Sequence, residues 1–349
     1  MIGESTIPLV RATGGPFERG HAHGVRLAGS LKAFVEDDLC RLNRLLAAPT
    51  TLEALAPRLA AYGEHITAGT PDLMIEIAGL AAGADLTLNE ALLLQCRREI
   101  MGYTRIPTSG DCTTYSRVGA GPAVLAQTVD LNGNLDDVLS VLRTGNEHDG
   151  QESLILSFGG LLGYLGVNGR GLAVGINLVL GGTWGPGVPP YLVIRHLLDE
   201  AGTVAEALDL LAGLHIASSR TFTLCDAGSV ACVEVLDNEL RVTRGESSVH
   251  TNHFLDPGFA RQDDLNVFAL NSSRQRLDAG RALLDSLPGT ADAEQHLRGL
   301  AAAPICVPDR GNIRSERTVA AVVLYPESGE LHLRPGDPSL SSTQVFSLR

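Results

Sequence analysis

The sequence predicts an α+β fold in which helices pack in layers against largely antiparallel sheets. Helix-like and strand-like segments are grouped along the chain: a helical first hundred residues, short strands, helices, then strands again. Many strand-like segments are joined by turns too short to hold a crossover helix, which favours antiparallel pairing. Hydrophobic residues occupy 44% of the 349 positions, which is enough for a sizeable core.

The N-terminal segment shows helical periodicity, with apolar residues recurring three or four positions apart. Leucines and other apolar residues between Leu31 and Leu46 follow this spacing, and a Leu/Ala-rich run begins after Thr51. A third apolar stripe, 73–80, ends near Gly83. Asn89 has the residue type of an N-cap, so the sequence predicts a helix from there to Ile100.

After Pro107 the pattern changes to short β-prone runs bounded by glycines. Helices are predicted after Pro190, and at 204–211, 273–287 and 291–301. A closing hairpin is expected to turn at Ser328-Gly329. The predicted strands are 112–116, 123–129, 153–157, 171–178, 221–225, 230–235, 318–325 and 331–334. No repeat or linker divides the chain, so we expect one domain over 1–349.

Charge and motif content exclude several functional classes. The chain carries 27 Lys and Arg against 40 Asp and Glu, a net charge of −13, so we expect no binding to nucleic acid or to an anionic membrane. The start lacks the basic and apolar regions of a signal peptide, which predicts a cytoplasmic protein. Phosphate-loop, Rossmann and G-x-S-x-G signatures are absent from the sequence, and the His21/His23 and His250/His253 pairs lack a third metal ligand. We therefore expect neither a cofactor nor a metal.

Cys112 stands apart from the other five cysteines. It lies in Ser-Gly-Asp-Cys-Thr-Thr (109–114), where helical sequence gives way to strand, whereas the others have apolar neighbours typical of buried thiols. Alone, this segment is more typical of a glycine-containing turn with an incidental Cys.

Several segments together resemble the acyl-coenzyme A:isopenicillin N (6-aminopenicillanic acid) acyltransferase family of N-terminal nucleophile (Ntn) hydrolases. The resemblance runs from about Gly15 to Pro338. It rests on the segments GPFERGHAHG (15–24), EIAGLAAG (76–83), RRE (97–99), SGDCTT (109–114), Asp130, GVNGRGLAVGIN (166–177), TNHF (251–254) and SSR (272–274). It implies a four-layer αββα sandwich.

The resemblance also implies a chemistry. The precursor would cut itself between Asp111 and Cys112 into fragments 1–111 and 112–349 that stay associated. Cys112 would then serve as nucleophile, with its own α-amine as base. The substrate would be a small acyl amide, with an acyl-CoA or an amine as co-substrate. The family commonly has Gly before the Cys, so Asp111 is a departure that puts self-cleavage in question.

Other roles carry over by position. Asn252 matches the family's oxyanion-hole Asn, and Asp130 matches the Asp that orients the Cys112 amine. Arg317 is the candidate for the family's active-site Arg, with Arg314 competing. Each has a plainer interpretation, as a turn Asn, a strand-end Asp or hairpin surface charges. Further candidates for the pocket are Thr113, Thr114, Asn177 and Arg274.

Two other hypotheses remain open from the sequence. An uncut Asp111–Cys112 bond would leave no α-amine, and the protein would be a binding module on the same scaffold. Alternatively, the chain would be a thioesterase that uses Cys112 with His250 or His253 as the base.

Overall fold

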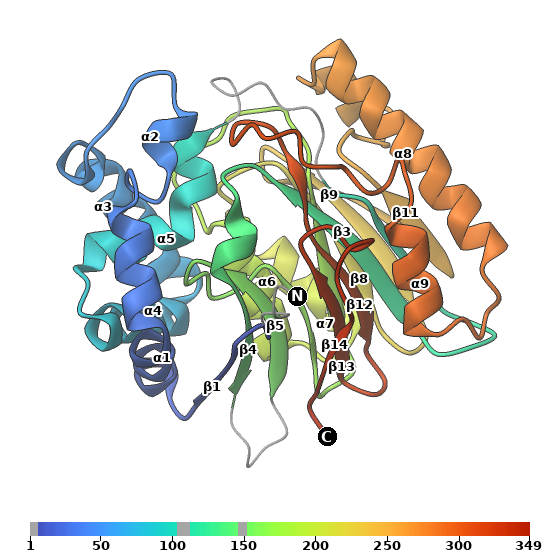
Figure 1. The fold of residues 1–349 in the computed structure, drawn as a ribbon, viewed down its shortest axis with the longest axis horizontal. Coiled ribbons are helices and arrows are strands. Elements are labelled where there is room, and N and C mark those ends of the chain that lie inside the picture. Colours follow the sequence, from blue (N-terminus) through green and yellow to red (C-terminus); the bar gives the residue numbers. More distant parts are fainter. Residues whose placement is uncertain (1–5, 103–111, 146–151) are drawn as a thin grey trace.

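Two mostly antiparallel sheets packed face to face form the centre of the molecule (Figure 1). The computed structural model describes residues 6–102, 112–145 and 152–349. The larger sheet has the order β1-β4-β5-β6-β7-β8-β9-β10, and the smaller has the order β11-β2-β3-β12-β13-β14. Only the pairing of β1 with β4 is parallel among the described strands.

The larger sheet consists of β1 (Leu9–Thr13), β4 (Leu139–Gly145), β5 (Ser153–Phe158), β6 (Leu165–Asn168), β7 (Ala173–Leu178), β8 (Arg220–Cys225), β9 (Val230–Leu236) and β10 (Glu239–Gly245). The smaller sheet consists of β2 (Thr114–Arg117), β3 (Val124–Leu131), β11 (Ser247–His250), β12 (Arg317–Tyr325), β13 (Glu330–Pro335) and β14 (Gln344–Ser347). Nearly every residue of the central strands β3, β5, β7, β8 and β12 is buried. Burial on both faces is what a sandwich with helices outside requires.

Helices cover the outer face of each sheet. The pair α6 (Pro190–Glu200) and α7 (Val204–Ala212) packs on the larger sheet, and α8 (Val267–Ser286) and α9 (Ala293–Leu300) pack on the smaller one. The layers are therefore α6/α7, sheet, sheet, α8/α9, which confirms the predicted α+β sandwich.

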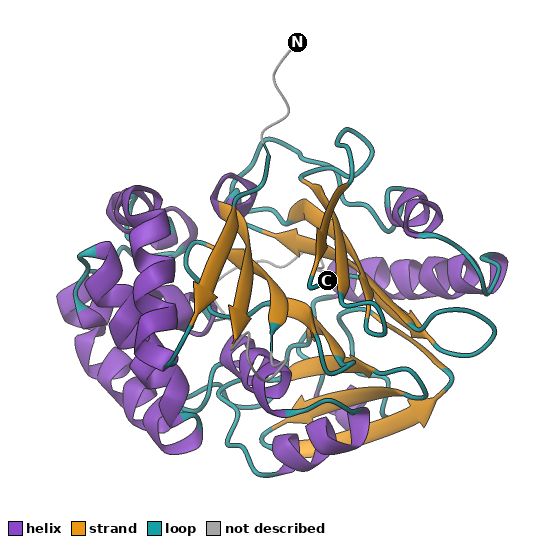
Figure 2. Cartoon of the chain, turned by 90° about the horizontal axis from the view of Figure 1, so that it is seen from below, coloured by secondary structure: helices purple, strands orange, loops and turns teal. Residues whose placement is uncertain are grey.

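The N-terminal helices gather to one side of this sandwich (Figure 2). They are α1 (Pro16–Glu36), α2 (Leu42–Leu45), α3 (Leu52–Gly69), α4 (Pro71–Ala84) and α5 (Leu88–Met101). The predicted Asn89 cap is wrong: the N-cap of α5 is Thr87, two residues earlier, which forms a capping box with Glu90. Among the described residues no single helix has the length and hydropathy to cross a membrane, and α4 with α5 reaches them only as a bent pair.

One polar side chain joins the two sheets near the middle of the core. Gln127 on β3 donates to the carbonyl of Ile176 on β7 at 2.8 Å and accepts from the Ile176 amide at 3.0 Å. A Cβ on Gly175 would lie 2.8 Å from the Gln127 side-chain oxygen, so glycine permits this close approach. The two bonds fix the position of β7 relative to β3 in the facing sheet, and thereby align the residues that surround Cys112.

Candidate active site

Cys112 lies at the head of β2, between the two sheets. Its neighbour Thr113 extends the β2–β3 pairing, because the Thr113 amide donates to Thr128 Oγ1 at 3.1 Å and the Thr128 amide donates to the Thr113 carbonyl at 2.9 Å. Only 2% of the Cys112 surface is exposed. The residue is thus held in place by a strand register and not by a surface turn.

Two side chains from different layers hold the backbone carbonyl of Cys112. Asn177 Nδ2, from β7, and Arg276 Nη1, from α8, each donate to this oxygen at 2.9 Å. Both side chains are fully buried. Asn177, predicted as a pocket residue, therefore contacts the nucleophile candidate directly.

Arg276 connects Cys112 to Asn252. Its Nη2 donates to Asn252 Oδ1 at 2.7 Å, while Nη1 also reaches Thr113 Oγ1 at 3.2 Å. Asn252 Nδ2 donates to the Leu178 carbonyl at 2.9 Å, and the Asn252 amide donates to Ser273 Oγ at 2.8 Å. Asn252 is therefore held through its backbone amide and through both ends of its side-chain amide.

The thiol faces an aromatic wall. Cys112 Sγ lies 3.7 Å from the Tyr164 hydroxyl, and the Tyr164 ring stacks on Tyr191 with centroids 5.0 Å apart. Burial raises the pKa of Tyr191 to about 12, so this phenol stays neutral near pH 7. A small pocket lies beside the thiol, and its lining is Arg98, Cys112, Leu131, Tyr164, Ile176, Leu178, Tyr191 and Arg220.

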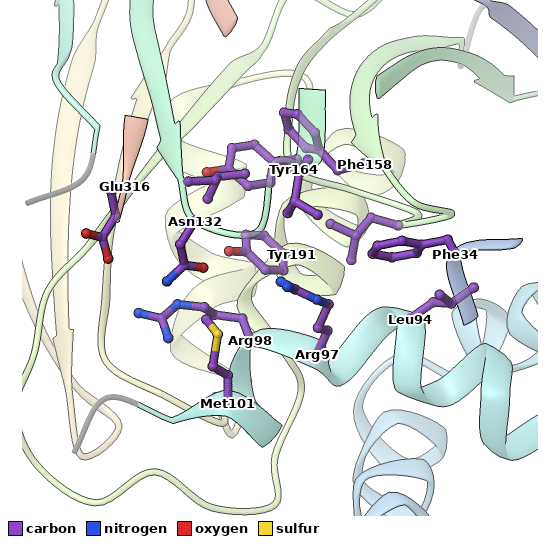
Figure 3. Close-up of a pocket in the computed structure, with 13 residues that line it drawn as sticks. Phe34, Leu94, Arg97, Arg98, Met101, Asn132, Phe158, Tyr164, Tyr191 and Glu316 are labelled. Atoms are coloured by element: carbon purple, nitrogen blue, oxygen red, sulfur yellow. The ribbon is translucent and has the colours of Figure 1, made fainter. Parts of the chain in front are cut away.

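This pocket adjoins a larger cavity (Figure 3). The two share Arg98, Leu131, Tyr164 and Tyr191. The remaining cavity lining is mostly apolar or aromatic: Phe34, Leu94, Met101, Leu135, Phe158 and Leu161. Its three polar residues are Arg97, Asn132 and Glu316. Gln95 shapes one wall, because it donates to the Gly160 carbonyl at 2.9 Å and accepts from the Leu162 amide at 3.0 Å.

Asp130 lies on β3, fully buried, and accepts a hydrogen bond from Thr318 Oγ1 at 2.6 Å. In the β2–β3 pairing Thr114 lies opposite Gln127. Continuing this antiparallel register by two residues sets Cys112 opposite Val129, the neighbour of Asp130 in the chain. The expected partnership between Asp130 and the Cys112 amine is compatible with this placement and stays a prediction.

Several other predicted residues lie elsewhere. Arg317 forms ion pairs with Asp136 at 2.6 Å and Asp309 at 3.5 Å and lines neither of the two pockets. Arg314 is exposed and donates to the Arg44 carbonyl at 3.0 Å. Arg274 is exposed on α8, two residues before the buried Arg276.

Thr114 is buried on β2, between β3 and β11. The predicted cleavage residue Asp111 lies outside the described residues.

The two histidines of the thioesterase hypothesis have other partners. His250 is hydrogen-bonded to Glu234 at 2.9 Å and to the Thr251 carbonyl at 2.8 Å, and His253 is hydrogen-bonded to Ser273 at 2.8 Å. Burial lowers the pKa of His253 to about 4.

Residues that the sequence did not single out complete the site: Arg98, Tyr164, Tyr191, Arg220 and Arg276. Of these, only Arg98 lies in a segment that the sequence had marked, Arg97-Arg98-Glu99.

The chain is similar in sequence to known proteins. A sequence model described as acyl-coenzyme A:6-aminopenicillanic acid acyltransferase matches residues 118–339. The 40 kDa form of the acyl-coenzyme A:6-aminopenicillanic-acid acyltransferase of Emericella nidulans is 25% identical over 300 residues, 81% of this chain and 79% of that protein.

Solved structures also resemble this one. Penicillin V acylase from Agrobacterium tumefaciens aligns with a TM-score of 0.49 and 16% identity, over 68% of this chain and 86% of the other. A Caenorhabditis elegans orthologue of N-acylethanolamine-hydrolyzing acid amidase aligns with a TM-score of 0.47 and 16% identity, over 68% of this chain and 100% of the other.

Proposed function

Because this chain belongs to the acyl-coenzyme A:6-aminopenicillanic acid acyltransferase family, whose members are acyltransferases and amide hydrolases of the Ntn type, we propose that Cys112 is its nucleophile. The substrate is a small acyl amide. The acyl group passes to Cys112 Sγ and then to water or to an amine. An acyl-CoA can replace the amide as the source of the acyl group.

The observation that carries this proposal is the setting of Cys112. Its carbonyl is held by Asn177 and Arg276, while its thiol faces a pocket. Each of the other cysteines has a thiol whose pKa is raised by burial, to about 12 in four cases and well above its ordinary value in Cys96. Since the thiolate is the reactive form, those five are poor nucleophiles.

Maturation would proceed by self-cleavage. Cys112 Sγ attacks the carbonyl carbon of residue 111, the C–N bond breaks as the acyl group moves to sulfur, and the nitrogen becomes the α-amine of Cys112. Water then hydrolyses the thioester, which releases the carboxylate of residue 111 and the thiol. Asp111 replaces the glycine common in the family. Its carboxyl group would belong to the same residue as the carbonyl carbon that Cys112 attacks.

Turnover would use the α-amine that cleavage creates. With a pKa near 7.7–8.0, a useful fraction of such an amine is neutral at physiological pH and can take the thiol proton. Sulfur bonds to the substrate carbonyl carbon, the C–N bond breaks, and the amine product leaves with that proton. Water or an acceptor amine then bonds to the same carbon, the C–S bond breaks, and sulfur regains a proton.

Asn252 is the proposed oxyanion donor and Asp130 the residue that orients the amine. In support, Arg276 donates both to Asn252 Oδ1 and to the Cys112 carbonyl, so it holds the Asn252 amide next to the proposed nucleophile. Asp130 is a buried carboxyl group near the end of the strand paired with β2.

Association of the fragments 1–111 and 112–349 would survive the cut. Strand β1 pairs with β4 over Leu9–Thr13 and Val141–Gly145, and Gln95 bonds the 160–162 loop, so both fragments contribute to shared sheet and core. The cytoplasmic location expected from the sequence stays a prediction.

Intact mass under denaturing conditions tests the proposal. Wild type should give fragments that begin at Met1 and Cys112, whereas Cys112→Ala should give one chain. Cys306→Ala is the matched control, because it removes a buried thiol and should still be cut. A wild-type chain that stays whole after long incubation would favour the binding module instead.

A second test follows the chemistry. Wild type and Cys112→Ala are assayed against N-acyl amino acids, acyl-β-alanyl amides and penicillins. Turnover should require Cys112, and an acyl-enzyme should be detectable by mass on the 112–349 fragment. Turnover by an uncut chain would favour the thioesterase hypothesis. Loss of activity in His250→Ala or in His253→Ala would then show which histidine is the base.

A further inference from the structure

A buried positive charge lines the cavity beyond the thiol pocket. Arg97, on α5, is 8% exposed and donates from Nε to the Cys40 carbonyl at 2.7 Å. Its Nη2 is buried and has no hydrogen-bond partner among the described residues. A Cβ on Gly133 would lie 2.8 Å from this nitrogen, so the glycine leaves room for the guanidinium at the cavity wall.

The next residue adds a second guanidinium. Arg98 lines both the cavity and the Cys112 pocket, and it donates to the Gly102 carbonyl at 2.8 Å. Figure 3 shows the Arg97 side chain extending from α5 toward Tyr191, and the Arg98 side chain extending from the same helix to a place below Asn132. Neither arginine forms an ion pair with a carboxylate within the part of the chain that the structure describes.

Two other buried arginines, in contrast, have carboxylate partners. Arg195 forms a bidentate pair with Glu76 at 2.8 and 2.9 Å. Arg220 pairs with Glu99 at 3.1 Å. A buried charge without a partner is costly, and a guanidinium binds a carboxylate through paired N–H groups. Burial lowers the pKa of Arg97 to about 10, so it remains positively charged at neutral pH.

The rest of the cavity is suited to an apolar body. Phe34, Leu94, Phe158 and Leu161 line it together with Leu135. A ligand in this space would place an apolar or aromatic group against these side chains and an anionic group at the arginines. Glu316 lies on the opposite side of Asn132 from Arg97 in Figure 3, so it does not fill the space beside the Arg97 guanidinium.

We propose that Arg97 and Arg98 form a carboxylate-binding subsite, and that the preferred substrates are amides carrying a carboxylate beyond an apolar or aromatic segment. The substrate part rests on the proposed function of Cys112, whereas binding of the anion does not. The two arginines set specificity, because they contact the substrate away from the bond that breaks.

Direct binding separates the two proposals. The probes are 4-phenylbutyrate and 5-phenylpentan-2-one, a ketone of similar shape in which a methyl group replaces the charged oxygen. Neither probe contains an amide bond, so its binding requires no catalysis. Isothermal titration calorimetry with the wild-type chain at neutral pH should give about 10- to 100-fold tighter binding of the carboxylate, as expected for hydrogen bonds to a charged group.

Variants locate the preference. Arg98→Gln should bring the affinity ratio of the two probes to within about 3-fold of unity, well below the range expected for charge-assisted bonds. Arg97→Lys, which keeps the charge but loses the fork of donors, should lower the ratio by a smaller factor and guards against loss of folding. Arg26→Gln, an exposed arginine on α1, is the matched control and should leave the ratio unchanged.

Three outcomes would overturn the subsite: no carboxylate binding at millimolar concentration, equal affinity for both probes, or an unchanged ratio in both Arg98→Gln and Arg97→Lys. A chain that binds the carboxylate selectively but never cuts itself or any amide would refute the function proposed for Cys112 and leave the subsite standing.

Discussion

Replacement of Arg276 tests how the proposed nucleophile and oxyanion donor are held together. Arg276→Met keeps much of the apolar side chain and removes the guanidinium that contacts Cys112 O at 2.9 Å, Thr113 Oγ1 at 3.2 Å and Asn252 Oδ1 at 2.7 Å. Hydrogen bonds from a charged donor contribute about 1.5–3 kcal/mol each, and Asn177 still serves the Cys112 carbonyl. We therefore expect Arg276→Met to lower the free energy of unfolding by about 3–5 kcal/mol.

Arg276→Lys separates charge from geometry. The ammonium keeps the positive charge, but one nitrogen replaces the planar fork that bridges Cys112 and Asn252. The expected loss of stability is smaller, about 1–2 kcal/mol for one or two bonds. If Asn252 loses its orientation, kcat should fall by about 10- to 100-fold, below the full loss of an oxyanion donor, with little change in KM.

Urea unfolding and steady-state kinetics on the same preparations measure both effects. Arg274→Met is the matched control, because Arg274 is exposed two residues earlier on α8 and should change neither quantity appreciably. A wild-type kcat in Arg276→Lys would refute the positioning role, and an unchanged unfolding free energy in Arg276→Met would refute the energetic reasoning. If Arg274→Met alone abolished activity, the residue predicted from the sequence would be the one that matters.

Three further outcomes are expected. Cys112→Ala should abolish both the cut before residue 112 and labelling by an acylating probe, as read by intact mass; equal labelling of the variant would contradict this. Asn252→Ala should fold and lower kcat by about 10²–10³-fold, the usual loss for one oxyanion donor; a wild-type rate would remove Asn252 from the site. Stability should fall as pH drops from 6.5 toward 4, because burial lowers the pKa of His23 and His296 to about 4 while the unfolded chain takes up those protons near 6.5. Each histidine contributes at most about 3 kcal/mol, and urea titrations of wild type and His296→Gln at pH 6.5 and 5 should show a shallower loss in the variant.

Helices with a regular apolar stripe, which pack that stripe in the core, could be predicted from the sequence. The stripe of Leu73, Ile77 and Leu80 is the buried face of α4, and the Thr51 side chain caps α3 by accepting from the Ala54 amide. Strand β1, in contrast, was not predicted. Its pairing with β4 joins residues more than a hundred positions apart, so no local pattern marks it.

Helix α8 shows why the site itself was only partly predictable. It begins at Val267, after an Asn266 cap, and not at the predicted Ser273. The apolar residues of its first turn, Val267 and Phe268, are exposed, so they do not continue the apolar face that marks the rest of the helix. Successive helical residues point about 100° apart, so residues two apart, such as Arg274 and Arg276, point to different sides of the helix. In Ser-Ser-Arg-Gln-Arg no apolar residue indicates which side is buried, and only packing against β2 selects Arg276.

The proposed cut has a consequence for the cavity, because the two sides of the cut supply different parts of it. Arg97 and Arg98 precede residue 111, whereas Cys112 and Tyr164 follow it. Neither fragment alone would hold both the proposed nucleophile and the proposed carboxylate subsite. Gln95 bonds across this divide to the Gly160 carbonyl and the Leu162 amide, deep in the core where water cannot replace the lost partners. Self-cleavage would thus expose a new amine at Cys112 without loosening the cavity, and the fragments would act only as an associated pair.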